Sequence, residues 1–384
     1  MTIFYEKYLP LEKKIFNNKR YRLNCSENLE IAKIFKKANI LVMGACGSIG
    51  FPITNEIINY DFNKIYLIDK NENSLTELNR EIILKNNKSK IKKINYICCD
   101  LTHLDIDKFI KDEKITHYFN FAAVKHVRSE ENINSLKYMF QTNSDSFLPK
   151  NKHRHLKIIF SVSSDKAVYP SSMLGVSKLL MEKKLMSYKL KNNSTNICCA
   201  RFANVSFSNG SILKFVADRL DQRKVFGIPK NIRRYFITHE EAKNLCLKSI
   251  LKKYQNKIIV PSHRSLGKDF LIKDLVDIIS KIKKKKINYT YKFDKNLKSN
   301  VVVLTDSNFV GQKLEEMLYY EEEITKINDN DDIIAIEFIS SLPVQKLLNE
   351  IYKLNSINLI KKYVLKNISS YKYFKKMKKL SYSI

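Results

Sequence analysis

Short apolar runs alternate with amphipathic segments through the N-terminal half of the chain. The segments between the runs carry apolar residues at helical spacing. The pattern predicts strands over residues 40–43, 64–69, 94–100, 117–123, 157–165 and 196–205. Strands and helices that alternate with short connections are typical of a parallel, doubly wound sheet. We therefore predict an α/β protein built on a Rossmann-type sheet.

This alternation loosens after residue 205 and divides the chain into four parts. Residues 1–38 form a charged extension and residues 39–205 a Rossmann domain that binds a dinucleotide. Residues 206–345 form a smaller C-terminal substrate-binding region, which is free to interleave with the Rossmann domain. Residues 346–384 form a Lys-rich helical tail in which the sequence offers no chemistry.

The charge balance raises the question of nucleic-acid binding. The chain of 384 residues carries 69 Lys and Arg against 39 Asp and Glu, a formal net charge of +30. Clustered cations neutralise phosphates, but this excess is mostly Lys and is spread along the chain. Only residues 282–287 and the C-terminal tail form local runs. We therefore expect no specific nucleic-acid partner.

Hydropathy and cysteine spacing limit the other classes. No apolar run reaches the roughly 18 residues of a membrane span, and the N-terminus lacks the apolar core of a signal peptide. We predict a cytoplasmic protein. The 7 cysteines lack metal-ligand spacing, and the adjacent pairs 98–99 and 198–199 lie in predicted strands. Neighbouring strand residues point to opposite faces, so we expect reduced core thiols and no metal site.

A glycine cluster follows the first predicted strand and precedes a helix. Gly44, Gly47 and Gly50 form a G-x-x-G-x-x-G pattern, in which glycines permit a tight turn and close approach of a pyrophosphate to the backbone. Asp69 ends the second strand, where its carboxylate can bind the adenosine ribose. An acid there favours NAD over NADP, and the neighbouring Lys70 keeps NADP as the alternative.

The remaining cofactor contacts are expected along the same edge of the sheet. Asp100 and Leu101 close the third strand and are predicted to lie near the adenine, although a strand-end Asp also serves as a helix cap. The full predicted set is Gly44, Cys46, Gly47, Ser48, Ile49, Gly50, Asp69, Asp100, Leu101, Ala122, Ala123 and Lys178.

The segment SVSSDKAVYPSSMLGVSK carries the candidate chemistry. Its strand delivers Ser164, Asp165 and Lys166 to the carboxyl end, where ligands bind in open α/β sheets. A Pro-containing loop and a helix with Lys178 follow. On structural grounds alone, Asp165 and Lys166 could also be a solvated turn pair.

Ordered motifs give this chain a family resemblance. They are GxxGxxG at 44–50, NFAAVKHV at 120–127, SSDKAVYP at 163–170, GVSK at 175–178, RFANV at 201–205, NGS at 209–211 and RRYFITHEEA at 233–242. With them the sequence resembles the polysaccharide-biosynthesis branch of nucleotide-sugar 4,6-dehydratases, which are extended short-chain dehydrogenase/reductases typified by UDP-N-acetylglucosamine 4,6-dehydratases. The resemblance covers residues 39–250, with a weaker echo at residues 304–317.

The resemblance implies a set of catalytic roles. It places the family's Ser/Thr on Ser164, the acid on Asp165, the base on Lys166 and the cofactor-contacting lysine on Lys178. The family's usual Tyr, four residues before that lysine, is replaced by Leu174. The usual acceptor of the C4 hydroxyl proton is therefore missing. The candidates to replace it are a relay through Ser164 to water, Lys166, and the nearby Tyr169.

The implied reaction is dehydration of a nucleotide sugar, with UDP-N-acetylglucosamine as the expected substrate, for surface polysaccharide or deoxy-amino-sugar biosynthesis. The sugar is oxidised transiently at C4, loses its C5 proton and C6 hydroxyl as water, and regains the hydride at C6. Lys166, with a lowered pKa, takes the C5 proton, and Asp165, with a raised pKa, protonates the C6 oxygen.

The prediction also includes residues that bind the sugar nucleotide and two alternative functions. Lys125, His126 and Asn204 are expected to line the sugar-nucleotide cleft, and Arg234 to chelate the diphosphate. We also expect a homo-oligomer. The alternative functions are a nucleotide-sugar epimerase, which has no need for an acid that expels the C6 hydroxyl, and a catalytically silent NAD-binding module.

Overall fold

The computed structural model describes residues 6–16, 19–297, 299–306, 313, 316–324, 331–338 and 342–371. Its centre is an eight-stranded sheet of order β15-β11-β6-β5-β4-β1-β2-β3. The strands are β1 (Asn39–Met43), β2 (Lys64–Asp69), β3 (Ile94–Cys98), β4 (His117–Asn120), β5 (Ile158–Ser164), β6 (Asn196–Phe202), β11 (Lys257–Pro261) and β15 (Ile333–Glu337). Neighbouring strands run parallel except β11 and β15. The predicted doubly wound α/β sheet is confirmed.

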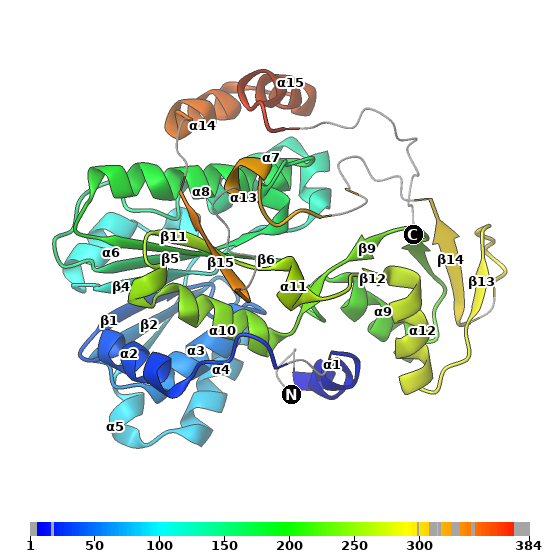
Figure 1. Ribbon diagram of the computed structural model, residues 1–384, viewed down its shortest axis with the longest axis horizontal. Coiled ribbons are helices and arrows are strands. Elements are labelled where there is room, and N and C mark those ends of the chain that lie inside the picture. The colour runs from blue at the N-terminus through cyan, green and yellow to red at the C-terminus, as the bar shows by residue number, and fades with distance from the viewer. Residues whose placement is uncertain are drawn as a thin grey trace.

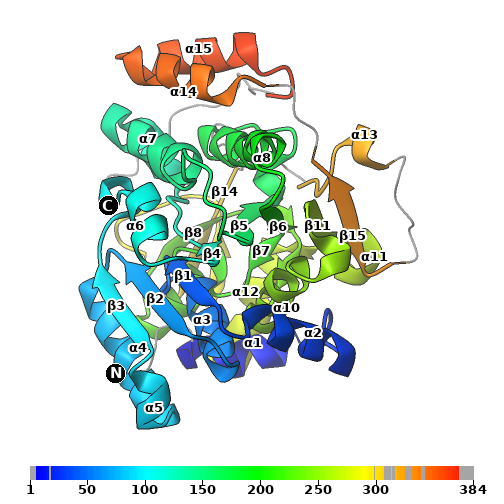
Figure 2. The same cartoon turned by 90° about the vertical axis from the view of Figure 1, so that its left-hand side faces the viewer.

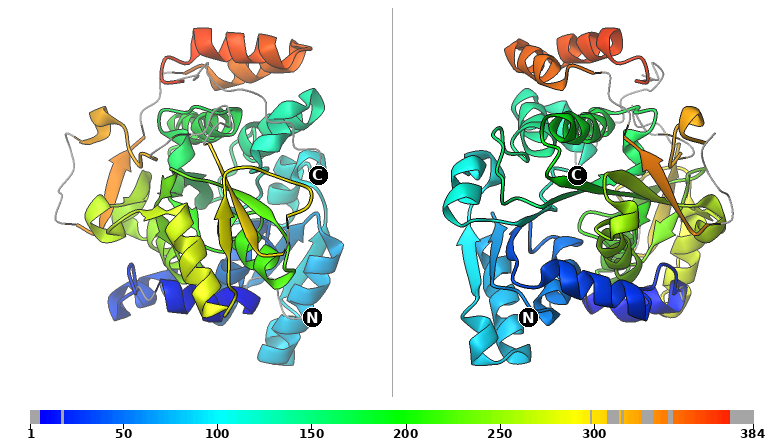
Figure 3. Two further views of the ribbon diagram at one scale, coloured as in Figure 1. Left: turned by 90° about the vertical axis from the view of Figure 1, so that its right-hand side faces the viewer. Right: turned by 60° about the vertical axis from the view of Figure 1, so that its left-hand side comes forward.

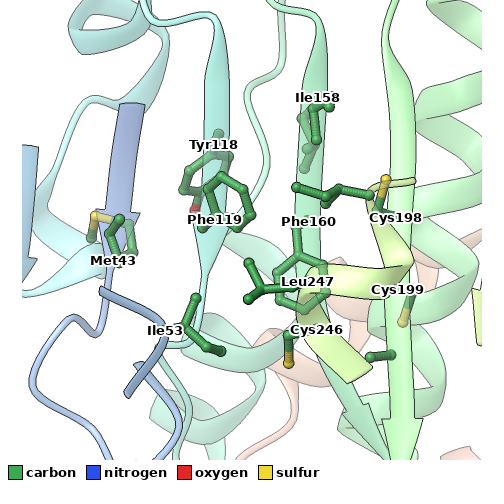
Figure 4. Close-up of a cluster of buried hydrophobic side chains, with 14 of the residues drawn as sticks. Met43, Ile53, Tyr118, Phe119, Ile158, Phe160, Cys198, Cys199, Cys246 and Leu247 are labelled. Atoms are coloured by element: carbon green, nitrogen blue, oxygen red, sulfur yellow. The ribbon is translucent and has the colours of Figure 1, made fainter. Parts of the chain in front are cut away.

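Helices cover both faces of this sheet (Figures 1 and 2). One face carries α2 (Cys25–Phe35), α3 (Gly50–Asn59), α4 (Glu72–Lys85) and α10 (His239–Ser249), and the other α6 (Ile106–Asp112), α7 (Ile133–Phe140) and α8 (Met173–Lys191). The strands are apolar on both sides because both faces are covered. Figure 4 shows Phe119, Phe160 and Leu247 packed together in this core, each at most 1% exposed.

A smaller region with its own core lies beside the sheet (Figure 1). It contains α9 (Ile212–Asp221), α12 (Ile272–Ile282) and a three-stranded sheet of β13 (Asn288–Thr290), β14 (Val301–Thr305) and β8 (Phe226–Pro229). Two short pairs join β7 (Asn204–Val205) to β10 (Phe236–Ile237) and β9 (Arg233–Arg234) to β12 (Phe270–Leu271). The chain returns to the main sheet at α10, β11 and β15, so residue 205 is not a single boundary.

The N-terminal extension packs into both regions. Its first helix, α1 (Leu9–Ile15), adds Leu11 to the core of the smaller region, while α2 adds Phe35 to the core of the main sheet. Between them, Arg20 pairs with Glu241 on α10, with Nε 2.7 Å from Oε1. The extension therefore ties the two regions together, a role that its lack of motifs did not indicate.

The C-terminal helices α14 (Val344–Lys353) and α15 (Ile357–Asn367) pack over α7 and α8 (Figures 2 and 3). The helical character of the predicted tail is thus present as far as Asn367, where α15 ends, and residues 372–384 lie outside the described part. The short elements are η1 (Glu6–Tyr8), α5 (Lys88–Ile91), η2 (Leu101–His103), η3 (Val127–Glu131), the π-helical η4 (Gln141–Asp145), η5 (Asp165–Ala167), η6 (Lys252–Tyr254), α11 (His263–Leu266) and α13 (Glu321–Ile324).

The cysteines test the expectation of reduced core thiols, and the helices bear on the expectation that the chain has no membrane span. All seven cysteines are free thiols, and Cys198 and Cys199 are buried as expected. Cys98 is exposed, because β3 is the edge strand of the sheet, so this thiol is not in the core. Across the described residues, no group of three or more His, Cys, Asp or Glu side chains could hold a metal. Within that same part, no helix has the length and apolarity to cross a bilayer.

Candidate active site

A cleft of about 2950 Å³ opens at the carboxyl edge of the main sheet and extends into the smaller region. Its walls come from the glycine loop, the loop after β4, the end of β5, the start of α8, and the smaller region. The predicted residues that line it are Gly47, Ser48, Ile49, Ala122, Ala123, Lys125, His126, Ser164, Asp165, Lys166, Lys178, Asn204 and Arg234. Gly44, Cys46, Gly50, Asp69, Asp100 and Leu101 lie behind or beside this wall.

The glycine loop has no room for side chains at two of its three glycines. Gly44 has φ +74°, and a Cβ there would lie 2.6 Å from the backbone nitrogen of Ala122. A Cβ on Gly50 would lie 2.1 Å from the carbonyl oxygen of Gly44. The bare backbone at the start of α3 therefore fits the close approach of a pyrophosphate to a helix N-terminus.

Two carboxylates lie where the adenosine half of the cofactor is predicted to bind. Asp69 accepts the N–H of Cys46 at 3.0 Å and the N–H of Asn71 at 3.0 Å, which fixes the glycine loop to the end of β2. Asp100 accepts the Thr102 N–H at 2.9 Å, so it acts as the cap that was the alternative to an adenine contact. Leu101 is buried beneath it.

A tyrosine that the sequence analysis did not single out joins the two strand ends. Tyr138 on α7 donates to Asp100, and Lys70 donates to the Tyr138 hydroxyl at 3.0 Å. Burial tends to raise the pKa of Asp100, but the hydrogen bonds from Tyr138 and Thr102 outweigh it and lower the pKa. Lys70 is therefore engaged on α7, beside Asp69 and Asp100.

The end of β5 carries an ionic cluster in which Asp165 and Glu316 are buried and Lys166 is 32% exposed. Lys166 Nζ lies 3.1 Å from Asp165 Oδ1 and 3.7 Å from Glu316 Oε1. Arg234 Nε lies 3.6 Å from that same Glu316 oxygen, and Lys313 Nζ lies 3.7 Å from the other. Asp165 Oδ2 is buried and accepts no hydrogen bond from any described residue. The pair is therefore not a solvated turn, and it leaves one acidic oxygen for a ligand.

The pKa of Asp165 is shifted as predicted, but the pKa of Lys166 is not. Burial raises the pKa of Asp165, which favours the protonated acid that the predicted reaction requires. Burial would lower the pKa of Lys166, but the negative charges of Asp165 and Glu316 outweigh it and raise the pKa. The expectation that Lys166 has a lowered pKa is wrong, because the charge of Asp165, with that of Glu316 added to it, outweighs burial.

The first turn of α8 positions Lys178 and Leu174. Lys178 Nζ donates to the Val162 carbonyl at 3.0 Å, and burial lowers the pKa of Lys178 to about 8. Leu174 is 4% exposed on the cleft wall, and its N–H donates to Glu130 Oε1 at 3.0 Å. The position that the family fills with Tyr therefore presents only an apolar side chain here.

Tyr169 does not replace the missing tyrosine. Its backbone has φ +40°, and its hydroxyl accepts the N–H of Glu321 at 3.2 Å. Its ring packs against Tyr320, with centroids 4.7 Å apart. These contacts hold the side chain against α13, and Tyr169 is absent from the cleft wall.

The substrate residues lie in the cleft, but Arg234 is already engaged. Its Nη1 donates to the Arg233 carbonyl at 2.7 Å and its Nη2 to the Lys313 carbonyl at 2.8 Å. Phosphate chelation by both nitrogens would require it to exchange these bonds. Asn204 donates weakly to the Tyr235 carbonyl at 3.4 Å.

His126 packs on the NGS turn of the smaller region. A Cβ at Gly210, where φ is +70°, would lie 2.0 Å from its Cε1 atom. Burial, together with the charges of Lys125 and Arg128, lowers the pKa of His126. Ser48 accepts the Asn209 N–H at 2.8 Å, so the glycine loop also contacts this turn. His126 thus contacts this turn from the cleft wall while its side chain stays exposed.

Sequence reasoning missed side chains that distant segments bring to the cleft. Glu316 and Lys313 come from residues 304–317, where the weaker echo was the signal available, although most of that segment lies outside the described residues. Lys361 on α15 also lines the cleft, so the helical tail reaches the site. Nothing in the spacing of these residues indicates that they meet.

The fold and the cleft define a dinucleotide-binding α/β protein with an acid–amine pair. The chain belongs to the family described as "Polysaccharide biosynthesis protein", whose model matches residues 40–338. It is a nucleotide-sugar-modifying enzyme of the epimerase/dehydratase group of extended short-chain dehydrogenase/reductases.

Three curated relatives span most of this chain. An uncharacterized membrane protein of Methanocaldococcus jannaschii is 27% identical, covering 80% of this chain and 88% of the relative. The capsular polysaccharide biosynthesis protein CapD of Staphylococcus aureus is 24% identical and covers 83% of this chain, which spans 53% of that relative. The UDP-glucose 4-epimerase of Rickettsia canadensis is 27% identical, covering 79% and 84%.

Solved structures share the fold. Pen from Bacillus thuringiensis superposes with a TM-score of 0.63 at 19% identity, covering 83% of this chain and 99% of that one. UDP-glucuronic acid 4-epimerase from Bacillus cereus, solved with a fluorinated UDP-sugar and NAD, gives 0.51 at 16% identity, covering 84% and 99%. At these identities the likeness supports the fold alone.

Proposed function

We propose that this protein is an NAD-dependent 4,6-dehydratase that acts on UDP-N-acetylglucosamine. The observation that carries the proposal is the Asp165–Lys166 pair at the carboxyl end of β5, where a buried carboxyl lies 3.1 Å from an amine whose side chain is 32% exposed. Removing water from a sugar requires a base for a carbon-bound proton and an acid for the departing hydroxyl. A carboxyl and an amine side by side in the cleft offer both.

The glycine cradle fits NAD, as in the Bacillus cereus neighbour solved with it. The loop at Gly44–Gly50 would hold the pyrophosphate, Asp69 the adenosine ribose, and Lys178 the nicotinamide ribose. When bound, NAD supplies the acceptor and later the donor of a hydride. Lys178 adds positive potential near the sugar oxygen that loses its proton. Asp69 favours NAD because its charge would repel the additional phosphate of NADP.

The acid–amine pair reaches its working state by one proton shift. When a proton passes from Lys166 Nζ to Asp165 along their 3.1 Å hydrogen bond, it leaves a neutral amine and a protonated acid. Substrate binding expels water, and desolvation favours this neutral pair over the ion pair. Lys166 then takes the proton from C5, and Asp165 gives its proton to the C6 oxygen, which leaves as water. As C6 regains the hydride, Lys166, whose protons exchange with water, returns a proton to C5, and a proton from water restores the pair.

An epimerase is the second candidate, because the Rickettsia relatives are UDP-glucose 4-epimerases. It would share the oxidation at C4 but would return the hydride to C4. A silent NAD-binding module is the third reading, raised by Leu174. Because every other predicted catalytic position is filled and lines the cleft, we propose an active enzyme.

Mass spectrometry of the sugar nucleotide separates these three functions. Purified protein with NAD and UDP-N-acetylglucosamine should yield a product lighter by the mass of water. Isomerisation at unchanged mass identifies an epimerase, and cofactor binding without turnover identifies a silent module. Lys184→Met is a matched control, because Lys184 pairs with Asp145 at 2.7 Å outside the cleft wall. It should retain turnover that Lys166→Met loses.

A further inference from the structure

The proposed reaction needs a group that accepts the proton of the C4 hydroxyl, and Leu174 offers none. Tyr169 is turned against α13. Lys166 is kept protonated by Asp165 and Glu316, and its proton shift serves the later elimination. Lys178 is 8% exposed and donates to the Val162 carbonyl. Ser164 can relay a proton, but as an alcohol it cannot keep one.

Lys125 stands on a loop that is held rigidly against α8. The preceding residue, Val124, donates its N–H to Asn143 Oδ1 at 2.8 Å, and its carbonyl accepts from Asn143 Nδ2 at 2.9 Å. Asn143 is 1% exposed and also donates to Ser177 Oγ on α8 at 2.9 Å. Val124 packs against the apolar cluster that contains Leu174. The loop therefore brings Lys125 to the wall where the tyrosine is missing.

Asn143 reaches this loop from the π-helical turn after α7. Such turns displace a side chain from the regular helical position and are frequent at functional sites. Here the turn aims an amide that satisfies both backbone groups of Val124. A loop residue fixed in this way costs little ordering entropy when substrate binds.

The surroundings of Lys125 are cationic. It lines the cleft and is reached by solvent, and no described acidic side chain forms an ion pair with it. Lys166 repels it from the end of β5, with Asp165 beside Lys166, while His126 and Arg128 stand on its own loop. The nearby Glu130 is engaged by the N–H of Leu174. Burial and the charge of Lys166 lower the pKa of Lys125 to about 8.

We propose that Lys125, as a neutral amine, accepts the proton of the C4 hydroxyl in place of the missing tyrosine. The inference rests on the proposed function. The O–H bond breaks and an N–H bond forms on Lys125, while C4 gives up its hydride to the oxidised nicotinamide and becomes a carbonyl carbon. The resulting ammonium returns its proton to the water of the open cleft. Before the proton shift, the charge of Lys166 adds to burial in favouring the neutral amine of Lys125.

The test isolates this first step. Wild type and Lys125→Met are mixed with NAD and UDP-N-acetylglucosamine, and the absorbance of reduced nicotinamide is followed in a single turnover. Lys125→Met should slow its formation about 100- to 10,000-fold. Lys125→Arg should be as slow, because it keeps the charge but cannot release a proton. Calorimetry should show NAD and UDP bound as in wild type. A Lys125→Met rate within threefold, roughly, of wild type would overturn the proposal.

A second readout does not depend on turnover. Competitive acetylation across a pH series should give Lys125 a reactivity midpoint near 8. A midpoint at the ordinary lysine value of about 10.4 would overturn the proposal. If the wild-type product has the same mass as the substrate, the dehydratase assignment fails. The role of Lys125 is still tested, because epimerisation begins with the same oxidation at C4.

Discussion

The Arg201 cluster and the Asp165–Lys166 cluster differ in how completely their charges are satisfied. In the first, Arg201 is 1% exposed between Glu182 and Glu323, and all three of its donor nitrogens are hydrogen-bonded. Glu182 also accepts from Ser163. In the second, Asp165 Oδ2 is buried without a hydrogen-bond partner among the described residues.

The difference separates a structural cluster from a reactive one. Arg201 joins β6 to α8 and to the segment around α13, and the two carboxylates keep its pKa raised despite burial. An unsatisfied buried oxygen costs free energy and persists where a ligand will use it. Asp165 therefore keeps one oxygen at the cleft that has no hydrogen-bond donor among the described residues, whereas every donor nitrogen of Arg201 is already hydrogen-bonded.

The largest expected effect is on catalysis. Asp165→Asn removes the acid for the C6 hydroxyl and should lower turnover about 100- to 10,000-fold. Stability should fall, because Lys166 loses its charged partner at 3.1 Å, but by less than in a fully buried pair, because Lys166 is 32% exposed. Steady-state kinetics and urea unfolding measure the two effects. Near-normal turnover in this variant would remove Asp165 from the mechanism and erase the contrast between the clusters.

The converse effect is expected at Arg201. Arg201→Met leaves Glu182 and Glu323 buried without their cation, which should cost about 3–5 kcal/mol of unfolding free energy. Turnover per folded molecule should change little, because Arg201 is absent from the cleft wall. Urea unfolding gives the first quantity and active-site titration the second. A stable but inactive Arg201→Met protein would contradict the structural role.

A smaller effect should follow when Glu316 loses its charge. Glu316 helps to raise the pKa of Lys166, so Glu316→Gln should lower that pKa. The pair of Lys166 and Asp165 then loses its shared proton at a lower pH than in the wild type. The pH at which turnover falls on the alkaline side should therefore decrease by about one unit. A pH–rate profile of wild type and variant measures the shift. An unmoved or upward-shifted limb would show that Glu316 does not hold Lys166 charged.

The smallest effect concerns cofactor choice. Asp69→Asn keeps an oxygen that can accept the Cys46 N–H and removes the charge, so it should relax the preference for NAD over NADP by about tenfold. Asp69→Ala should relax it too and also loosen the glycine loop, which weakens binding of both cofactors. Calorimetry with each dinucleotide compares the variants. Tighter binding of NADP than of NAD by the wild type would contradict the assignment.

The fold and half of the cleft follow from local patterns. The roles of Gly44 and Gly50 are predictable because the turn at Gly44 and the close backbone contact at Gly50 leave no room for a side chain. Asp165 and Lys166 are predictable because a parallel strand delivers them to the ligand edge. The elements that form this part of the site are continuous in the sequence.

The remainder depends on contacts between distant segments. Glu316 adds to the charge of Asp165 in raising the pKa of Lys166, and no spacing links residues 166 and 316. Asn143 fixes the loop of Lys125 only because a π-helical turn redirects it. Arg234 was expected to be free for phosphate, but its bonds to Lys313 and Glu316 appear only once the chain is folded.

One measurement tests the central claim, which is that the Asp165–Lys166 pair performs a dehydration. The protein is incubated with UDP-N-acetylglucosamine in heavy water, and the sugar nucleotide is analysed by mass spectrometry and proton NMR. The account predicts a product that has lost water and carries solvent deuterium at C5, formed by wild type and absent with Asp165→Asn. A product of unchanged mass without deuterium at C5 would contradict it.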